Sequence, residues 1–501
     1  MTITGIGSSI ATSALAQQNM QNQLDVLSRQ LGTGQKAAVY SDLGSQAGLT
    51  VGLDAQLSAL GGYDATNSTI TTTLGIAEGA LSQIGDVQAA VQGAAQQPAS
   101  FTLGAGGQTA LQASAADQLD QVLGLLNTQV GDNYLFSGSA PNQRSVDTTD
   151  HILNGNGALA GLTQVISERN QADLGASGLG RLVIPPVVGS TVSINEDVAG
   201  SPFGFKLAGV NSTLTRATVT QPSGSPKTMT VALGANPNNG DSVQFSLTLP
   251  DGSNKTITLQ ATSTVPPGAN QFVIGATPAA TAGNLQTALT TAVSNLAQTE
   301  LPAASAVAAA NNFFGQPPQR VTGPAFNSAT ALQNGTSADT VFWYTGESGA
   351  TPARQTALAQ VGPSTTVSYG MRADEQAFTT IVASIAVLAA ASYSTANPNA
   401  AASYSALTSR VASNLSIQQG AQNISDVDAD IANAQVTAKN AQSVNNQTRS
   451  TLTNMLQQVE GVSADQIGTE ILALQNSLQA SLSTTARLSQ LSLVNYLGAT
   501  G

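Results

Sequence analysis

Cysteine is absent from this chain of 501 residues, and charged and aromatic residues are scarce. Without cysteine the protein has neither disulfide bonds nor thiol chemistry. Charged residues make up 9% and aromatic residues 4% of the chain, while small and amide residues dominate. This composition is unusual for a cytosolic enzyme and compatible with a place outside the cell. A chain of this length has room for about two to four domains.

Positive charge is especially scarce. The formal net charge is −12, with 16 Lys and Arg in total and none between residues 37 and 143. Nucleic acids and anionic membrane surfaces both bind through clustered cations. The sequence therefore predicts neither nucleic acid nor membrane as a partner.

Targeting and membrane-spanning patterns are also missing. The N-terminus has no basic segment, since the first cation is Arg29, and we expect no cleaved Sec or Tat signal. The longest apolar run, residues 381–391, is too short to cross a bilayer. If the protein leaves the cell, it uses a route that reads no such signal.

Catalytic motifs are missing as well. His151 is the only histidine, which excludes a zinc-protease motif with two histidines. Residues 346–350 lack the last glycine of a nucleophile elbow, and residues 32–36 lack the Ser or Thr of a phosphate loop, so we expect a turn there. The carboxylates of residues 426–430 are typical of the first turn of a helix. We predict no enzyme, and no catalytic, cofactor-binding or metal-binding residue.

The last forty residues carry the pattern around which the chain is organised. Apolar residues recur there at spacings of three and four, which predicts a long helix with one apolar face. Burying five such side chains contributes roughly 7–15 kcal/mol, whereas ordering some thirty residues costs on the order of 30 kcal/mol. This helix needs a partner. The stripe consists of Ile467, Ile471, Leu474, Leu478 and Leu482, continued by Leu488 and Leu491.

The N-terminal segment offers that partner, because Leu24, Leu27 and Leu31 repeat at three and four. Two interpretations remain open. The two termini form a coiled coil that becomes ordered on assembly, or they are two ordinary core helices of a monomer.

Further helices are expected in both flanks. The run from Ile70 to Val91 is heptad-like, and a helix over residues 111–130 is expected to stop at Gly131. Beyond the middle of the chain, helices are expected over residues 375–391, 398–415 and 427–459. Ser463 and Gln466 form a capping-box pattern at the start of the last helix.

The middle of the chain changes character. Residues 243–249 and 257–259 alternate apolar and polar on either side of a Pro-Asp-Gly turn, which predicts a β-hairpin. A helix over residues 281–298 follows. Residues 340–344 and 365–369 are predicted to form another strand pair, with Trp343 in the core.

Together these patterns predict a mainly α protein. Its elongated coiled-coil stem is formed by the N- and C-terminal segments, and an α+β, β-rich middle domain is inserted into it. The predicted division is a terminal coiled-coil domain (1–40 with 461–501), a helical rod domain with β-hairpins (41–186 with 340–460) and an inserted α+β outer domain (187–339).

Three segments of the sequence resemble the bacterial flagellin superfamily. Residues 31–49, LGTGQKAAVYSDLGSQAGL, resemble its N-terminal signature, and residues 478–497, LQASLSTTARLSQLSLVNYL, are similar to its closing helix. Residues 133–139, NYLFSGS, resemble a phrase typical of the hook–filament junction branch, the third hook-associated proteins. The likeness covers the two flanks and leaves the middle without a match.

The resemblance implies a structural axial subunit of the bacterial flagellum that supports motility. Such a chain is exported by the flagellar type III apparatus, lies outside the cell and assembles with itself and with other axial proteins; an export chaperone is a further candidate partner. The ten apolar residues named above then line the subunit interface. Filament subunit and junction protein both remain open, and a secreted adhesin with a helical stalk is the alternative from another class.

Overall fold

A computed structural model describes residues 4–97, 100–104 and 106–497. Its contacts divide the chain into two compact units. The first takes in the residues up to 71, residues 359–367 and the residues from 436 onward, and the second takes in residues 72–358 and 368–435. Helices α2 (Ala47–Gln96) and α9 (Ile424–Glu460) contribute residues to both units.

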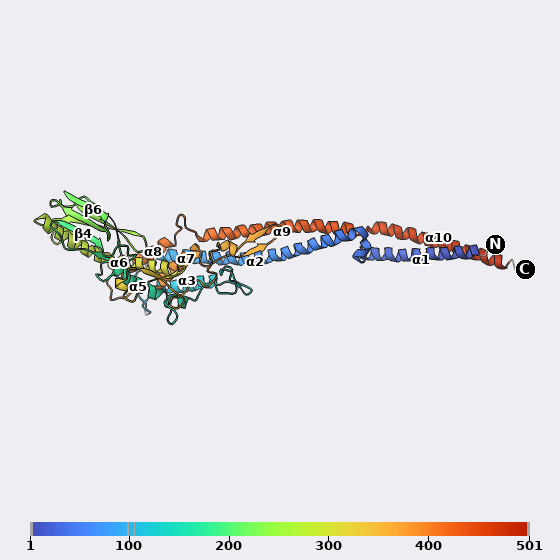
Figure 1. Ribbon diagram of the computed structural model, residues 1–501, viewed down its shortest axis with the longest axis horizontal. Coiled ribbons are helices and arrows are strands. Elements are labelled where there is room, and N and C mark those ends of the chain that lie inside the picture. Colours follow the sequence, from blue (N-terminus) through green and yellow to red (C-terminus); the bar gives the residue numbers. More distant parts are fainter. Residues whose placement is uncertain (1–3, 98–99, 105, 498–501) are drawn as a thin grey trace. The chain divides into compact units, whose positions relative to one another are not determined.

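The first unit consists mainly of paired helices. α1 (Thr4–Thr33) packs beside α10 (Ala464–Leu497), as Figure 1 shows at the blue and red ends of the chain. The 3-10 helix η1 (Tyr40–Gln46) leads into α2, whose Leu53 and Leu60 share a core with Leu452 of α9. The hairpin of β13 (Leu358–Gln360) and β14 (Thr366–Ser368) adds residues 359–367 to this unit.

The β-rich middle of the chain lies in the second unit as two four-stranded sheets that share a core with one helix. Their orders are β3-β4-β7-β6 and β10-β9-β8-β5, with β9 and β10 parallel. Apolar residues alternate along the strands, so one face of each sheet packs on α6 (Pro278–Phe313). The strands are β3 (Leu182–Val183), β4 (Thr191–Glu196), β5 (Lys206–Ser212), β6 (Ala217–Ser223), β7 (Thr228–Leu233), β8 (Ser242–Thr248), β9 (Asn254–Thr262) and β10 (Gln271–Val273).

Helices account for most of the remaining regular structure of the second unit. α7 (Gln376–Ala390) is almost wholly buried and packs against α3, α6 and α8, which explains its continuous apolar sequence. The remaining elements are α3 (Ala110–Leu126), β1 (Gln129–Val130), β2 (Asn133–Tyr134), α4 (Thr149–Asn154), α5 (Leu162–Leu174), β11 (Gln319–Val321), η2 (Phe326–Ser328), β12 (Leu332–Asn334), η3 (Ala353–Thr356) and α8 (Ala400–Asn414).

The mainly α architecture with long terminal helices and a β-rich middle is confirmed. So are the hairpin of β8 and β9 and the core position of Trp343, which is 1% exposed and donates its indole N–H to the Phe314 carbonyl at 3.1 Å. The predicted division into three domains stays a prediction.

The predicted end of the third helix is wrong. α3 ends at Leu126, because the side chain of Asn127 accepts from the backbone N–H groups of Ser145 and Val146 and turns the chain out of the helix. Gly131, expected to stop the helix, instead adopts φ 61° in the turn between β1 and β2.

The strand pair predicted for residues 340–344 and 365–369 is also wrong. β14 pairs with β13, while Thr340 makes an isolated bridge to Ala160 and Tyr344 one to Val146. The alternation of these segments was visible in the sequence, but their partners lie elsewhere in the chain. Helices α4 and α5 were missed altogether.

Candidate subunit interface on the terminal helices

The terminal helices meet along a seam that follows heptad spacing. On α10 the seam advances by steps of four and three from Ile467, which is 6% exposed, through positions that are half-buried. A pair of helices alone cannot enclose such a seam completely, and within the described part of the chain the positions after Ile467 are only partly covered. The seam positions are Ser13, Gln17, Met20, Leu24 and Leu27 on α1, and Ile467, Ile471, Leu474, Leu478, Ser481 and Thr485 on α10.

The part of the seam nearer the chain ends is polar. The side-chain amide of Gln17 donates to Ser481 Oγ at 3.4 Å and to Thr485 Oγ1 at 3.1 Å. These residues were not among the predicted interface residues. Strict heptad counting from Ile467 leads to Ser481 and Thr485, whereas the search for apolar residues led to Leu482.

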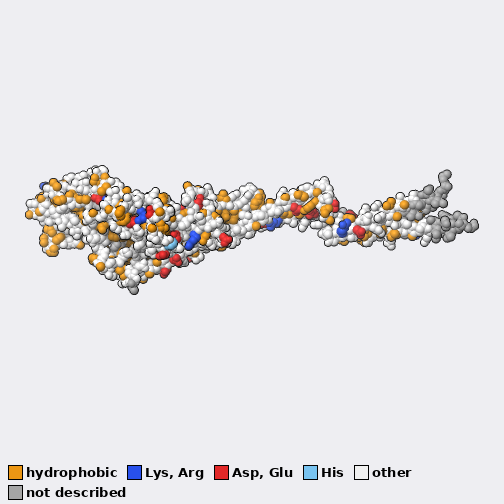
Figure 2. All heavy atoms as spheres, turned by 60° about the horizontal axis from the view of Figure 1, so that its bottom comes forward, with side chains coloured by type: hydrophobic (Ala, Val, Ile, Leu, Met, Phe, Trp, Pro, Cys, Tyr) orange, Lys and Arg blue, Asp and Glu red, His pale blue; other side chains and the backbone are white. Residues whose placement is uncertain are grey.

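Several predicted interface residues lie off the seam. Leu31 is 44% exposed, Leu482 50% and Leu488 38%. Other apolar side chains of the same helices are equally open, with Leu15 at 60% and Leu472 at 63%. Figure 2 shows few charged side chains among the apolar and uncharged polar ones on the visible face of these helices. The side chain of Leu491, also predicted for the interface, lies outside the described residues.

The segment that follows α1 is hydrogen-bonded to the junction between α9 and α10. Gln35, after α1, forms an antiparallel bridge with Gly461, between α9 and α10. The backbone N–H of Lys36 donates to the Glu460 carbonyl at 2.6 Å, and Gly34 has φ 72°. A side chain at Gly461 would place its Cβ 2.3 Å from the Gln457 carbonyl oxygen, so glycine is required here. The expected turn at residues 32–36 is therefore what aligns α1 with α10.

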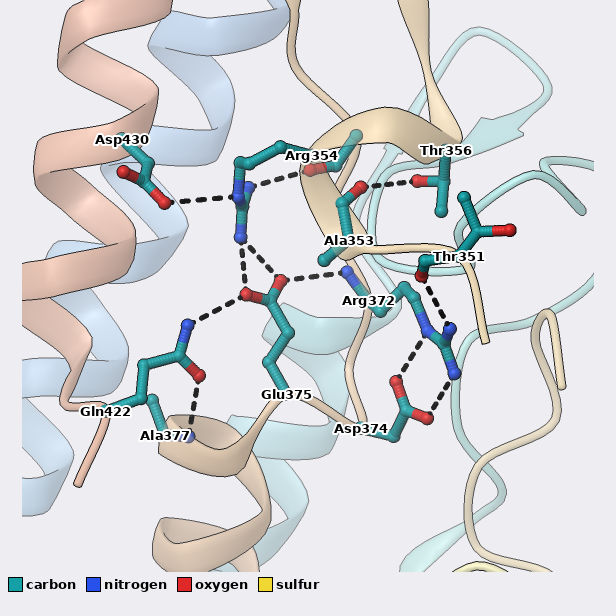
Figure 3. Close-up of polar contacts among 11 residues, drawn as sticks. Thr351, Ala353, Arg354, Thr356, Arg372, Asp374, Glu375, Ala377, Gln422 and Asp430 are labelled. Atoms are coloured by element: carbon teal, nitrogen blue, oxygen red, sulfur yellow. Dashed lines mark hydrogen bonds and ion pairs between the residues drawn. The ribbon is translucent and has the colours of Figure 1, made fainter. Parts of the chain in front are cut away.

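Figure 3 shows a cluster of polar side chains that are hydrogen-bonded to one another. The guanidinium of Arg354 donates through Nη2 to both carboxylate oxygens of Glu375, at 2.6 and 2.5 Å, and lies 3.5 Å from a carboxylate oxygen of Asp430. The amide of Gln422 donates to the same Glu375 at 3.1 Å, and Arg372 pairs with its own neighbour, Asp374. These side chains join η3, which precedes β13, to the starts of α7 and α9. Two arginines thus serve three carboxylates, and these contacts fasten the segments to one another.

Other chemistry is equally limited. Within the described ranges no group of three or more His, Asp or Glu side chains could hold a metal ion. His151 Nδ1 lies 3.1 Å from Asp147 Oδ1, four residues earlier on the chain. None of the described helices combines the length and apolar character that a membrane span requires.

One comparison with known proteins gives a match. The family model described as "Bacterial flagellin N-terminal helical region" matches residues 6–141, which take in most of α1, all of α2 and α3, and strands β1 and β2. No curated protein matches the chain.

Proposed function

We propose that this chain, a member of the bacterial flagellin superfamily, is a structural axial subunit of the flagellum that polymerises through its terminal helices. The observation that carries the proposal is the coincidence of two features in α1. The family match covers this helix, and the helix keeps apolar side chains such as Leu15 and Leu31 exposed to solvent. A structural role also fits the flagellin family that the match describes.

The physical mechanism is ordering coupled to assembly. In a single copy the seam is half-buried, and its polar part includes the hydrogen bonds from Gln17 to Ser481 and Thr485. Neighbouring copies would cover Leu31, Leu482 and Leu488 and stabilise both helices at once. The ten interface residues predicted from the sequence then divide into two sets. Leu24, Leu27, Ile467, Ile471, Leu474 and Leu478 bind the two helices of one copy, and Leu31, Leu482 and Leu488 bind the next copy, with Leu491 as a proposed member of that second set.

The junction protein at the base of the filament is a second candidate function, favoured by the phrase at residues 133–139. This phrase is built into the fold. Phe136 is buried, its ring lies edge-on to Phe378 at 5.6 Å, and its carbonyl accepts from the Ala373 backbone. Gly138, with φ 68°, donates to the Met371 carbonyl. Residues 133–139 thus hold the segment before α7 in place. Such a structural role is compatible with both a filament subunit and a junction protein.

Place and partners follow from the same proposal. Flagellins are exported to build a filament outside the cell, so we infer export by the flagellar type III apparatus and an extracellular position. Copies of this chain and other axial proteins are the proposed partners, with an export chaperone before assembly. The family match favours this role over a secreted adhesin.

Localisation tests the proposal and separates its two forms. The chain has no cysteine, so Thr258→Cys, at an exposed position of β9, creates a single site for a thiol-reactive dye. Dye along the whole flagellum identifies a filament subunit, and one band at its base identifies a junction protein. Dye on the cell surface away from flagella would refute both. A dye-treated strain with the unsubstituted chain is the control.

A further inference from the structure

Two buried asparagines meet one backbone carbonyl in the first unit. Asn67 of α2 donates its side-chain amide to the Val361 carbonyl at 3.0 Å, and Asn445 of α9 donates to the same oxygen at 2.8 Å. Asn67 is 0% and Asn445 2% exposed, and Val361 is also fully buried. Val361 lies in the turn between β13 and β14. These three residues, the Asn67 pin, therefore join two long helices and a hairpin at one atom.

The Asn67 pin is only partly satisfied by hydrogen bonds. Asn67 Oδ1 is buried and meets no donor among the described residues, and the same holds for Asp64 Oδ1 and Thr71 Oγ1. These residues stand three before and four after Asn67, so all three oxygens lie on one face of α2. The other oxygen of Asp64 pairs with Arg449 of α9. Buried acceptors without donors cost stability, which offsets part of what the hydrogen bonds to the Val361 carbonyl contribute.

The seam between α2 and α9 accepts leucine elsewhere. One heptad from the Asn67 pin, Leu60 and Leu452 pack together in the core of this unit. The contacts 60 with 452, 64 with 449 and 67 with 445 show that these helix segments run antiparallel. If α9 slipped by seven residues along α2, Asn67 would lie opposite Leu452 or the buried Ala438. It would no longer lie opposite Asn445. At least one asparagine would then be buried away from the shared acceptor.

We propose that the Asn67 pin is a register lock, which selects a single alignment of α2, α9 and the β13–β14 hairpin. A buried polar residue in an otherwise apolar helix seam acts in this way, because every slipped pairing leaves it without a partner. The lock concerns the alignment of one copy. Only its assembly readout depends on the proposed function.

The test compares Asn67→Leu/Asn445→Leu with Asn446→Leu, a matched control at the exposed neighbouring position of α9. Spin labels are attached to cysteines at Ser58 and Ser443, both exposed, and their separation is measured by pulsed electron paramagnetic resonance. The unsubstituted chain and the control should each give one distance. The double variant should give a second distance population, displaced along the helices by about 10 Å, the rise of one heptad.

A single, unchanged distance in the double variant would overturn the proposal. If the double variant does not fold, Asn67→Ala is measured in its place, and extra distance populations in that variant support the lock. Failure of both variants to fold would show that the pin holds the structure together rather than selecting its alignment, which also overturns the proposal. A loss of polymer together with an unchanged distance would instead place these residues in subunit contacts, against the lock but not against the proposed function.

Discussion

Replacing two exposed leucines of α10, Leu482 and Leu488, should weaken assembly without disturbing the folded monomer. Leu482 is 50% and Leu488 38% exposed. Neighbouring copies can therefore still bury about half of Leu482 and about two fifths of Leu488. Full burial of a leucine is worth about 1.5–3 kcal/mol. The remaining burial therefore contributes about 0.7–1.5 kcal/mol at Leu482 and about 0.6–1.1 kcal/mol at Leu488. Together these values correspond to a rise of roughly ninefold to eightyfold in the critical concentration for polymerisation.

The assay measures the monomer concentration that remains in equilibrium with polymer, by sedimentation, for Leu482→Ala/Leu488→Ala. Ser483→Ala, at an exposed position between the two leucines, is the matched control and should leave the critical concentration unchanged. Circular dichroism at a concentration below assembly confirms that the monomers are alike. A critical concentration within twofold of the parent, with normal monomer folding, would refute the reasoning that these leucines contact neighbouring copies.

Three further predictions follow from the same structure. Polymerisation should depend weakly on ionic strength, because the proposed contacts are apolar and amide-rich; a steep loss of polymer as salt is raised, seen by light scattering, would contradict this. Gly461→Val should loosen α10 while the second unit stays folded, because its Cβ meets the Gln457 carbonyl oxygen; faster protease cleavage in α10 than in the parent is expected, and equal rates would count against it. In acid the second unit should lose stability. Hydrogen bonds from Thr215 hold the pKa of Asp241 below its usual range, and the hydrogen bond from the Ser139 N–H likewise lowers the pKa of Glu347. For such carboxyl groups the stabilisation is present above the unfolded-state pKa, about 4, and is lost as the pH falls through the lower folded-state pKa; a melting temperature independent of pH from 6 to 2 would contradict this.

Local patterns were enough to predict the long helices and the β8–β9 hairpin. Spacing of three and four is a property of one segment, so α7, α8 and α10 could be placed without knowing their neighbours. The strand signal at residues 366–368 was also local, but its partner could not be read from it. Pairing depends on which segments the rest of the fold brings together.

The seam itself shows the limit of reasoning from hydrophobicity. Leu482 was predicted to lie at the interface because it is apolar. The half-buried position of the seam between α1 and α10 is instead Ser481, three residues after Leu478. The partner that makes Ser481 suitable is Gln17, which is 464 residues away in sequence. The Asn67 pin could not be predicted from the sequence for the same reason, since its partners lie far away along the chain. Its meaning depends on Val361, a carbonyl in a hairpin that sequence patterns do not connect to α2.

Deleting residues 464–501 tests the central claim most directly, because it removes α10 and leaves the second unit intact. Electron microscopy of the purified chain and of the deletion variant at equal concentration is the measurement. We predict filaments or ring-like assemblies from the full chain, and a soluble monomer with a cooperative thermal transition from the variant. Equal assembly by the two chains would contradict the claim that the terminal helices carry polymerisation.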